Sequence, residues 1–215
     1  MKGNTNKTVL PHGEGNTEVE FRALLDDDQV KILLEKLKSG EVESKGEEKI
    51  IDLYFCKNDV KDISEVEMKE VGSYSLRLRE KDKNGTKGID LNVKIITSLG
   101  DHNVLDEHET VVESLEESYK ILTSIGFKLF LKLKKTRNIF YISAHRMTVN
   151  IEYIEDFGFA IEVEIITTLE MVEESKQKIK NYLSDIGVKP DQMVTKSITY
   201  LLMNKIAKFD GSVTL

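Results

Sequence analysis

The sequence predicts an α+β domain built on an eight-stranded, mostly antiparallel β-barrel with a polar interior and helices outside it. Residues 17–23 and 161–165 alternate charged and apolar side chains, which is the period of a strand with one polar face. Strands rich in Arg and Lys lie between these two Glu-x-Glu strands, and amphipathic helical segments follow the first, fifth and last strands. A single strand of this kind fits a solvated sheet face. Two of them, with basic strands between, favour a closed sheet with its polar faces inward.

Composition supports one folded domain. The chain has 215 residues, of which 40% are hydrophobic and 32% charged, so a core can form and disorder is not expected. We expect a flexible tail over residues 1–16, a single domain over 17–208 and a second tail over 209–215. The net charge of -7 argues against a nucleic-acid partner. The one cysteine, Cys56, excludes an internal disulfide framework and is expected to be a small buried residue.

Residues 1–16 are polar and lack the apolar stretch of a signal peptide. No segment approaches the apolar length that spans a bilayer. The expectation is therefore a cytoplasmic protein without a membrane partner. Its oligomeric state stays open, and a homodimer is compatible with exposed helices at the edge of a barrel.

Sequence signals for helices lie between the predicted strands. Asp26 to Asp28 can cap a helix that runs to about Lys38, where Ser39-Gly40 ends it. Further helices are expected over 113–124, 169–186 and 194–207, and residues 210–215 are expected to fray. Strands are expected over these ranges: 17–25, 49–56, 73–81, 88–97, 103–112, 127–141, 147–154 and 160–167. Lys83-Asn84-Gly85 predicts a hairpin turn, and 44–48 reads as a polar connection.

The parity of each strand gives the side chains that would face the interior. They combine cations, carboxylates and amides from seven strands: Glu18, Glu20, Arg22, Arg77, Arg79, Asp90, Asn92, Lys94, Glu107, Glu109, Lys135, Arg137, Arg146, Thr148, Asn150, Glu152, Glu162 and Glu164. Arg and Lys match phosphate oxygens, and carboxylates with water bind Mg²⁺ or Mn²⁺. Such an interior must be wet and open, because burying unpaired charge is costly.

The order of these motifs resembles the CYTH superfamily, the triphosphate tunnel metalloenzymes, over about residues 17–205. The superfamily includes class IV adenylyl cyclases, thiamine triphosphatases and inorganic triphosphatases. The matching segments are Glu18-Val19-Glu20-Phe21-Arg22, Leu76-Arg77-Leu78-Arg79, Lys94, Glu107-x-Glu109, Lys135-Thr136-Arg137 with Phe140, Phe157-Gly158 before Glu162-Val163-Glu164, and Ser197 to Leu201 with Tyr200. Three positions depart from the family pattern: Arg22 replaces a lysine, Cys56 an aspartate and Glu152 an aspartate.

The resemblance implies a triphosphate tunnel fold, a Mg²⁺ or Mn²⁺ cofactor and a hydrolase that releases phosphate from a small-molecule triphosphate such as tripolyphosphate or ATP. It implies a catalytic group of Glu18, Glu20, Arg22, Glu162 and Glu164. It implies phosphate binding by Arg22, Arg77, Arg79, Lys94, Lys135 and Arg137. It implies metal binding by Glu18, Glu20, Glu109, Glu152, Glu162 and Glu164.

Two other functions remain open at this point. A class IV adenylyl cyclase would use the same phosphate-binding and metal-binding side chains to convert ATP to cyclic AMP and pyrophosphate. A non-catalytic module would hold polyphosphate or a nucleotide without turnover, as the departures at Arg22, Cys56 and Glu152 suggest. Arg22 in particular keeps the charge of lysine but cannot act as a base, because it is essentially always protonated.

Overall fold

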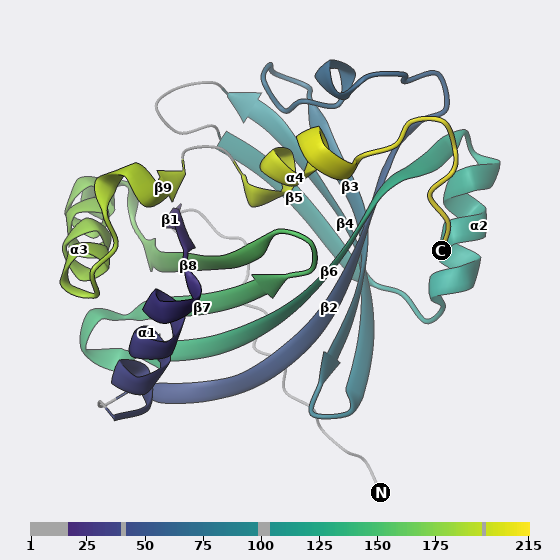
Figure 1. The fold of residues 1–215 in the computed structure, drawn as a ribbon. Helices are drawn as coiled ribbons and strands as arrows, with labels where there is room; N and C mark the ends of the chain where they lie inside the picture. Colours follow the sequence, from purple (N-terminus) through teal and green to yellow (C-terminus); the bar gives the residue numbers. More distant parts are fainter. Residues whose placement is uncertain (1–16, 40–41, 99–103, 195–196) are drawn as a thin grey trace, which may run out of the picture.

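A strongly curved antiparallel sheet forms the centre of the molecule (Figure 1). The computed structural model describes residues 17–39, 42–98, 104–194 and 197–215. Within these ranges, nine strands pair in the order β5-β4-β3-β2-β6-β7-β8-β1-β9. Their bounds are β1 Thr17–Leu25, β2 Glu43–Lys57, β3 Tyr74–Lys83, β4 Thr86–Ser98, β5 Val104–Val111, β6 Phe127–Ile142, β7 Met147–Ile154, β8 Gly158–Thr167 and β9 Met193–Val194.

The antiparallel α+β class is confirmed, but the closed eight-stranded barrel is wrong. The sheet is open, with β5 at one edge and β9 at the other, and no ladder joins β5 to β1 within the described ranges. The two-residue strand β9 pairs with Arg22 and Ala23 along the side of β1 that does not face β8. Strand parity shows which face is polar, whereas closure depends on the tilt and stagger of the strands.

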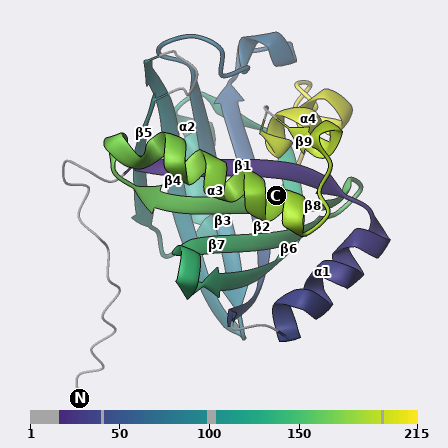
Figure 2. The same ribbon diagram turned by 90° about the vertical axis from the view of Figure 1, so that its left-hand side faces the viewer.

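The described residues form four α-helices beside the sheet: α1 (Asp27–Ser39), α2 (Leu115–Ser124), α3 (Val172–Asp185) and α4 (Ile198–Ile206). Figure 2 shows α3 lying across the sheet, with α1 beside it. The helices α1 and α3 bury their apolar sides on the outer face of β1, β6, β7 and β8. Helix α2 covers a smaller cluster over β2, β3 and β6 that includes Phe55, Leu78 and Leu122. These two apolar clusters lie outside the curve of the sheet. A third cluster, which α4 covers, lies on the inner face and includes Leu133, Ile154 and Leu202, so this helix is not an outer one as expected. The rest of the inner face carries polar side chains.

Most helix signals act as expected. The Asp26 carboxylate accepts a hydrogen bond from the Gln29 amide at 2.8 Å, which caps α1. Ser114 caps α2 in the same way, through the Glu117 amide. Gly187 follows α3 with φ +91°, a left-handed conformation that favours glycine at a helix end. The ranges 1–16 and 40–41, which include the expected tail and helix stop, lie outside the described residues.

Several boundaries differ from the expectations. Residues 44–48 belong to β2, because they pair with the far end of β6. The helix expected over 169–186 begins as a 3₁₀ turn over Leu169–Met171 before α3. The helix expected over 194–207 begins only after its Ser197 cap, while β9 precedes it and 195–196 lie outside the described residues. The hairpin is confirmed, with Asn84 and Gly85 both at positive φ.

The chain after α4 returns to the outside of β6 and ends beside α2 (Figure 1). The Lys208 amide donates to the Phe130 carbonyl at 2.9 Å, and the Phe209 ring stacks on Phe130 at 5.2 Å between centroids. Lys128 Nζ donates to the carbonyls of Val60 and Phe209 at 2.7 and 2.5 Å. These contacts hold α4 in place over one part of the sheet. In the described ranges no helix is both long and apolar enough to span a membrane.

Candidate functional site

A polar cavity of about 570 Å³ occupies the concave face of the sheet. Every strand from β1 to β8 contributes to its lining, and the start of α4 covers part of it. Its polar lining residues are Glu20, Arg22, Asp52, Tyr54, Arg77, Arg79, Lys94, Glu107, Glu109, Lys135, Arg137, Glu152, Glu162, Glu164, Ser197 and Thr199. The alternation of side chains along each strand thus brings charges from distant parts of the sequence to one place.

Of the residues that strand parity alone placed inward, Glu107 lines this cavity, whereas Asp90, Asn92, Thr148 and Asn150 do not. Among the residues with an expected catalytic, phosphate-binding or metal role, all but one line it. The exception is Glu18, whose backbone lies in β1 but whose side chain is outside the described part of the structure. Arg146, expected by parity to face inward, is exposed in a left-handed turn before β7 and does not line the cavity. The placement agrees with the expected site, while the role of each residue stays a proposal.

Ion pairs cross the floor of the cavity in an alternating series. Arg22 pairs with Glu20 on its own strand, and its Nε donates to Glu162 Oε2 at 3.1 Å across to β8. Arg137 Nη2 lies 3.8 Å from the other oxygen of Glu162 and 2.6 Å from Glu152 Oε1. Glu162 therefore stands between two cations, and Arg22 and Arg137 each stand between two carboxylates.

The series continues onto β2 and β3. Lys135 Nζ lies 2.8 Å from Glu152 and 3.9 Å from Asp52. Arg79 then donates to both oxygens of Asp52, from Nε at 2.5 Å and from Nη2 at 2.8 Å. This fork is the strongest type of ion pair in proteins.

A separate pair lies on β4 and β5. Lys94 Nζ is 3.0 Å from Glu107 Oε2, and Asn92 donates to Glu107 Oε1 at 2.5 Å. Arg77, on β3, differs from the other arginines. Its Nε is buried without a hydrogen-bond partner among the described residues, and the nearest carboxylate, Asp52, is 3.8 Å away. A buried donor in this state has unused capacity for an anion.

Asp52 and Tyr54 are functional candidates that the sequence reasoning missed. Asp52 is 1% exposed and faces three of the expected phosphate-binding cations. Tyr54 holds α4 against β2 through a 3.1 Å hydrogen bond with the Thr199 hydroxyl. The available signal was Asp52 itself, because a lone carboxylate inside the apolar run from Ile50 to Cys56 requires a buried partner.

Electrostatics keep the central carboxylates ionised. Burial alone would raise the pKa of Glu162, but the charges of Arg137 and Arg22 hold that pKa well below the usual range. Burial would likewise raise the pKa of Glu107, and Lys94 with Asn92 lowers it. Ionised oxygens at these positions are suited to cations.

The donor set fits a divalent ion such as Mg²⁺ or Mn²⁺ in kind. Glu20 and Glu164 are directly opposite each other on β1 and β8, and Glu162 lies on the same face of β8. Oxygen ligands of this type are the ones that these hard ions take. Within the described ranges, however, no three Asp, Glu, His or Cys side chains gather closely enough to form a ready-made site.

The structure shows the environment of the three residues that depart from the family pattern. Arg22 is engaged by carboxylates on both sides. Glu152 is 3% exposed, and the contacts described for it are with Lys135 and Arg137. Cys56 is 1% exposed and does not line the cavity, and burial raises the pKa of its thiol to about 11, so it is an inert core residue, as expected.

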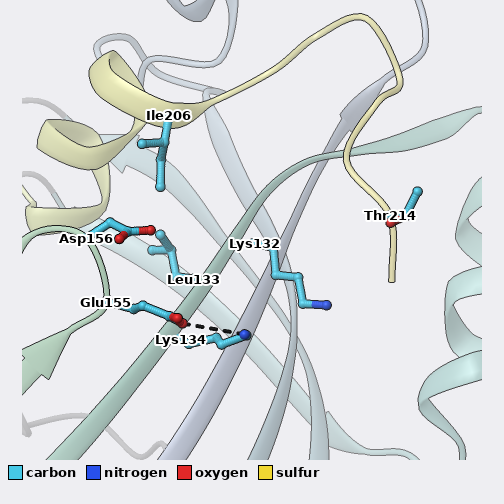
Figure 3. Close-up of a pocket in the computed structure, with 7 residues that line it drawn as sticks. All are labelled: Lys132, Leu133, Lys134, Glu155, Asp156, Ile206 and Thr214. Carbon is cyan, nitrogen blue, oxygen red and sulfur yellow. Dashed lines mark ion pairs between the residues drawn. The ribbon is translucent and has the colours of Figure 1, made fainter.

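A second hollow of about 380 Å³ lies where β6, the β7–β8 turn and the chain end meet (Figure 3). Lys132 and Lys134 approach it from β6, and Lys134 pairs with Glu155 at 3.5 Å. Leu133, Asp156, Ile206 and Thr214 complete the lining. It contains no convergent set of carboxylates and arginines like that of the cavity, so we assign the candidate site to the concave face.

The family assignment agrees with this geometry. Residues 16–198 match the model of the CYTH domain, so the chain belongs to the CYTH family. Proteins of this family bind triphosphates, generally depend on a divalent metal and include triphosphatases and adenylyl cyclases. A comparison with curated protein sequences finds no match.

Solved structures share the fold. A Pyrococcus horikoshii protein is 24% identical with a TM-score of 0.70, covering 88% of this chain and 99% of that protein. A protein from Vibrio parahaemolyticus, described as a "putative adenylate cyclase", is 17% identical with a TM-score of 0.67 and the same two coverages. A Bacillus halodurans protein with the same description is 17% identical with a TM-score of 0.58, covering 86% of this chain and 97% of that protein. These likenesses establish the architecture.

Proposed function

We propose that this protein is a divalent-metal-dependent enzyme that hydrolyses the terminal phosphate of a small triphosphate in its concave cavity. The observation that carries the proposal is the convergence of six cationic side chains from β1, β3, β4 and β6 on one cavity. One of them, Arg77, has a buried donor without a hydrogen-bond partner among the described residues. Arg and Lys in such an array match the oxygens of a polyphosphate.

Charge balance supports the need for a metal. The described lining has six cationic side chains and seven carboxylates, so it is not electropositive as it stands. A triphosphate brings several further negative charges, and repulsion from the carboxylates would oppose its entry. Divalent ions held by Glu20, Glu162 and Glu164, with Glu18 and Glu109 as further candidates, would reverse this balance.

The cationic side chains of the cavity would bind the phosphate chain and stabilise the charge that develops during the reaction. Arg77, Arg79 and Lys94 would hold one part of the phosphate chain, while Arg22, Lys135 and Arg137 would hold another. Because these cations come from a rigid sheet, they would fix the terminal phosphorus for in-line attack and stabilise the charge that develops on its oxygens. Arg22 would serve as a permanent cation rather than as a base. A bound metal would supply the activation of water and further charge neutralisation.

A cyclase is the second candidate, and one observation favours it. The two structures described as "putative adenylate cyclase" have the same fold over most of this chain. In that reaction the ribose 3′-hydroxyl of ATP would attack its own α-phosphorus and release pyrophosphate. The same cations would then hold the β- and γ-phosphates, so the two reactions differ in which phosphorus meets the nucleophile.

The products identify the reaction. The purified protein is incubated with Mg²⁺ or Mn²⁺ and, in separate samples, with tripolyphosphate, ATP or thiamine triphosphate, while phosphate, pyrophosphate and cyclic AMP are measured. Release of phosphate that a chelator stops would support the hydrolase. Cyclic AMP and pyrophosphate from ATP would support the cyclase instead. Saturable binding without any product would favour a non-catalytic module.

A further inference from the structure

Asp52 is the most deeply buried charged group in the described wall of the cavity, with 1% of its surface exposed. Its carboxylate faces three cations from two neighbouring strands. Arg79 forms the bidentate fork, and Arg77 Nε and Lys135 Nζ lie at 3.8 and 3.9 Å. A fully buried carboxylate with this many cationic neighbours is held in one orientation.

The fork also fixes Arg79. A guanidinium is planar, and the bonds to Asp52 use Nε and Nη2, the donors along one edge. Its remaining edge, which carries Nη1, is therefore directed away from Asp52. Arg79 lines the cavity, so this second edge is the part of the group available to a ligand there. Without Asp52, the long side chain would regain rotamer freedom that a ligand would have to remove.

Arg79 has two acidic neighbours, and the structure distinguishes them. Its register partners are Asp52 on β2 and Asp90 on β4. Asp90 is also buried, at 5% exposed, but its described partner is Lys81, which is outside the cavity lining. The guanidinium fork is made with Asp52 alone of these two. Asp90 therefore offers a matched control of the same residue type and similar burial.

We propose that Asp52 is a positioning residue that holds Arg79 in the orientation required for phosphate binding. The proposal rests on the proposed function, since it assumes that a triphosphate enters the cavity. It gives a prediction opposite in sign to that of simple electrostatics. Removing a negative charge from the cavity would by itself strengthen anion binding. Loss of a positioning group would instead weaken it.

The test is calorimetric titration of imidotriphosphate, a triphosphate with nitrogen bridges that resist hydrolysis, in the presence of Mg²⁺. We expect Asp52→Asn to lower the affinity about tenfold, the effect of losing one well-made charged contact. Asp90→Asn should keep or increase the affinity. The Nε–H signal of Arg79 in an NMR spectrum should shift strongly in Asp52→Asn and little in Asp90→Asn.

Each other outcome has a defined meaning. Binding to Asp52→Asn as tight as to the wild type, or tighter, would overturn the positioning role while leaving the proposed function intact. An absence of binding to the wild-type protein would remove the proposed function and this proposal with it. If Asp52→Asn does not fold, Arg79→Lys replaces it, because lysine keeps the charge but cannot form the fork. Unchanged affinity in Arg79→Lys would then contradict the proposal.

Discussion

Arg22 on β1 donates from Nε to Glu162 on β8 at 3.1 Å, and the two residues are register partners across the sheet. One is an expected phosphate ligand and the other an expected metal ligand, so each neutralises the other in the structure. Binding of a metal and a phosphate would exchange this internal pair for two external ones. The internal pairing offsets the cost of holding these charges in a buried cavity.

Substitution of Glu162 or Glu164 by Gln should abolish turnover. The change removes the anionic ligand but keeps the shape of the side chain, so activity should fall about a hundredfold or more while the fold is retained. Phosphate release and circular dichroism measure the two properties. Glu155→Gln is the control, because Glu155 lines the second hollow and not the cavity, and it should leave activity unchanged. Full activity in both cavity variants would remove them as metal ligands.

Substitution of Arg77 by Ala should mainly weaken substrate binding. Its Nε has no hydrogen-bond partner among the described residues, so truncation removes no hydrogen bond of this group, although it removes a charge 3.8 Å from Asp52. We expect the apparent affinity for tripolyphosphate to fall about tenfold or more, in line with loss of a charged hydrogen bond. Steady-state kinetics and a thermal melt separate the alternatives. A large drop in melting temperature would identify Arg77 as structural.

The pH dependence of stability should report on Asp52. Burial alone would raise the pKa of this carboxyl, but the hydrogen-bonded Arg79 and the charges of Lys135 and Arg77 hold it well below its usual range. In the unfolded chain its pKa is about 4. Its stabilising contribution is therefore complete above about pH 4 and is lost as the pH falls toward the depressed folded value.

Urea unfolding of the wild type and Asp52→Asn across this range tests the linkage. The wild type should be more stable by about 3–5 kcal/mol near neutral pH, the usual cost of breaking a buried pair. This difference should shrink as the pH falls below about 4. A difference that stays constant from neutral to acidic pH would mean that the Asp52 charge does not stabilise the fold.

Lys128 should control the attachment of the chain end. Its ammonium joins the carbonyls of Val60 and Phe209, so Lys128→Met leaves both without this donor while keeping an apolar stem. The loss should destabilise the protein by about 1–3 kcal/mol and expose the last residues to protease. Lys132→Met, on β6 but on its other face because a bulge lies between the two lysines, is the control and should be near neutral. Equal proteolysis of the two variants would contradict the assigned role.

Strand parity predicted many of the side chains that line the cavity, but not Asp52 and Tyr54. Charged alternation along β1 and β8 indicated one polar face, and residues as distant as Arg22 and Glu162 meet there as a consequence. The family motifs pointed to the same face. The ion pairs could not be predicted. Strand parity gives the face of the sheet on which a side chain lies, but not the partner that a flexible side chain selects.

The sequence could not predict that the sheet is open or that Asp52 pairs with Arg79, and the reasons differ. The two residues of β9 are too short to show a period, yet they pair along the edge of β1. Asp52 sits in a strand that otherwise reads as buried and apolar, and its partner Arg79 was already assigned to phosphate. Only the three-dimensional structure shows that Arg79 pairs with Asp52.

Diffraction from crystals soaked with Mn²⁺ and imidotriphosphate tests the central claim most directly, because the anomalous signal of the metal locates it independently. The account predicts a metal peak beside Glu162 and Glu164, with the phosphate chain among Arg77, Arg79 and Arg137 in the concave cavity. Two results would contradict it. One is a metal and phosphate bound only at the second hollow near Lys132 and Lys134. The other is no ordered ligand in the cavity at concentrations that saturate binding in solution.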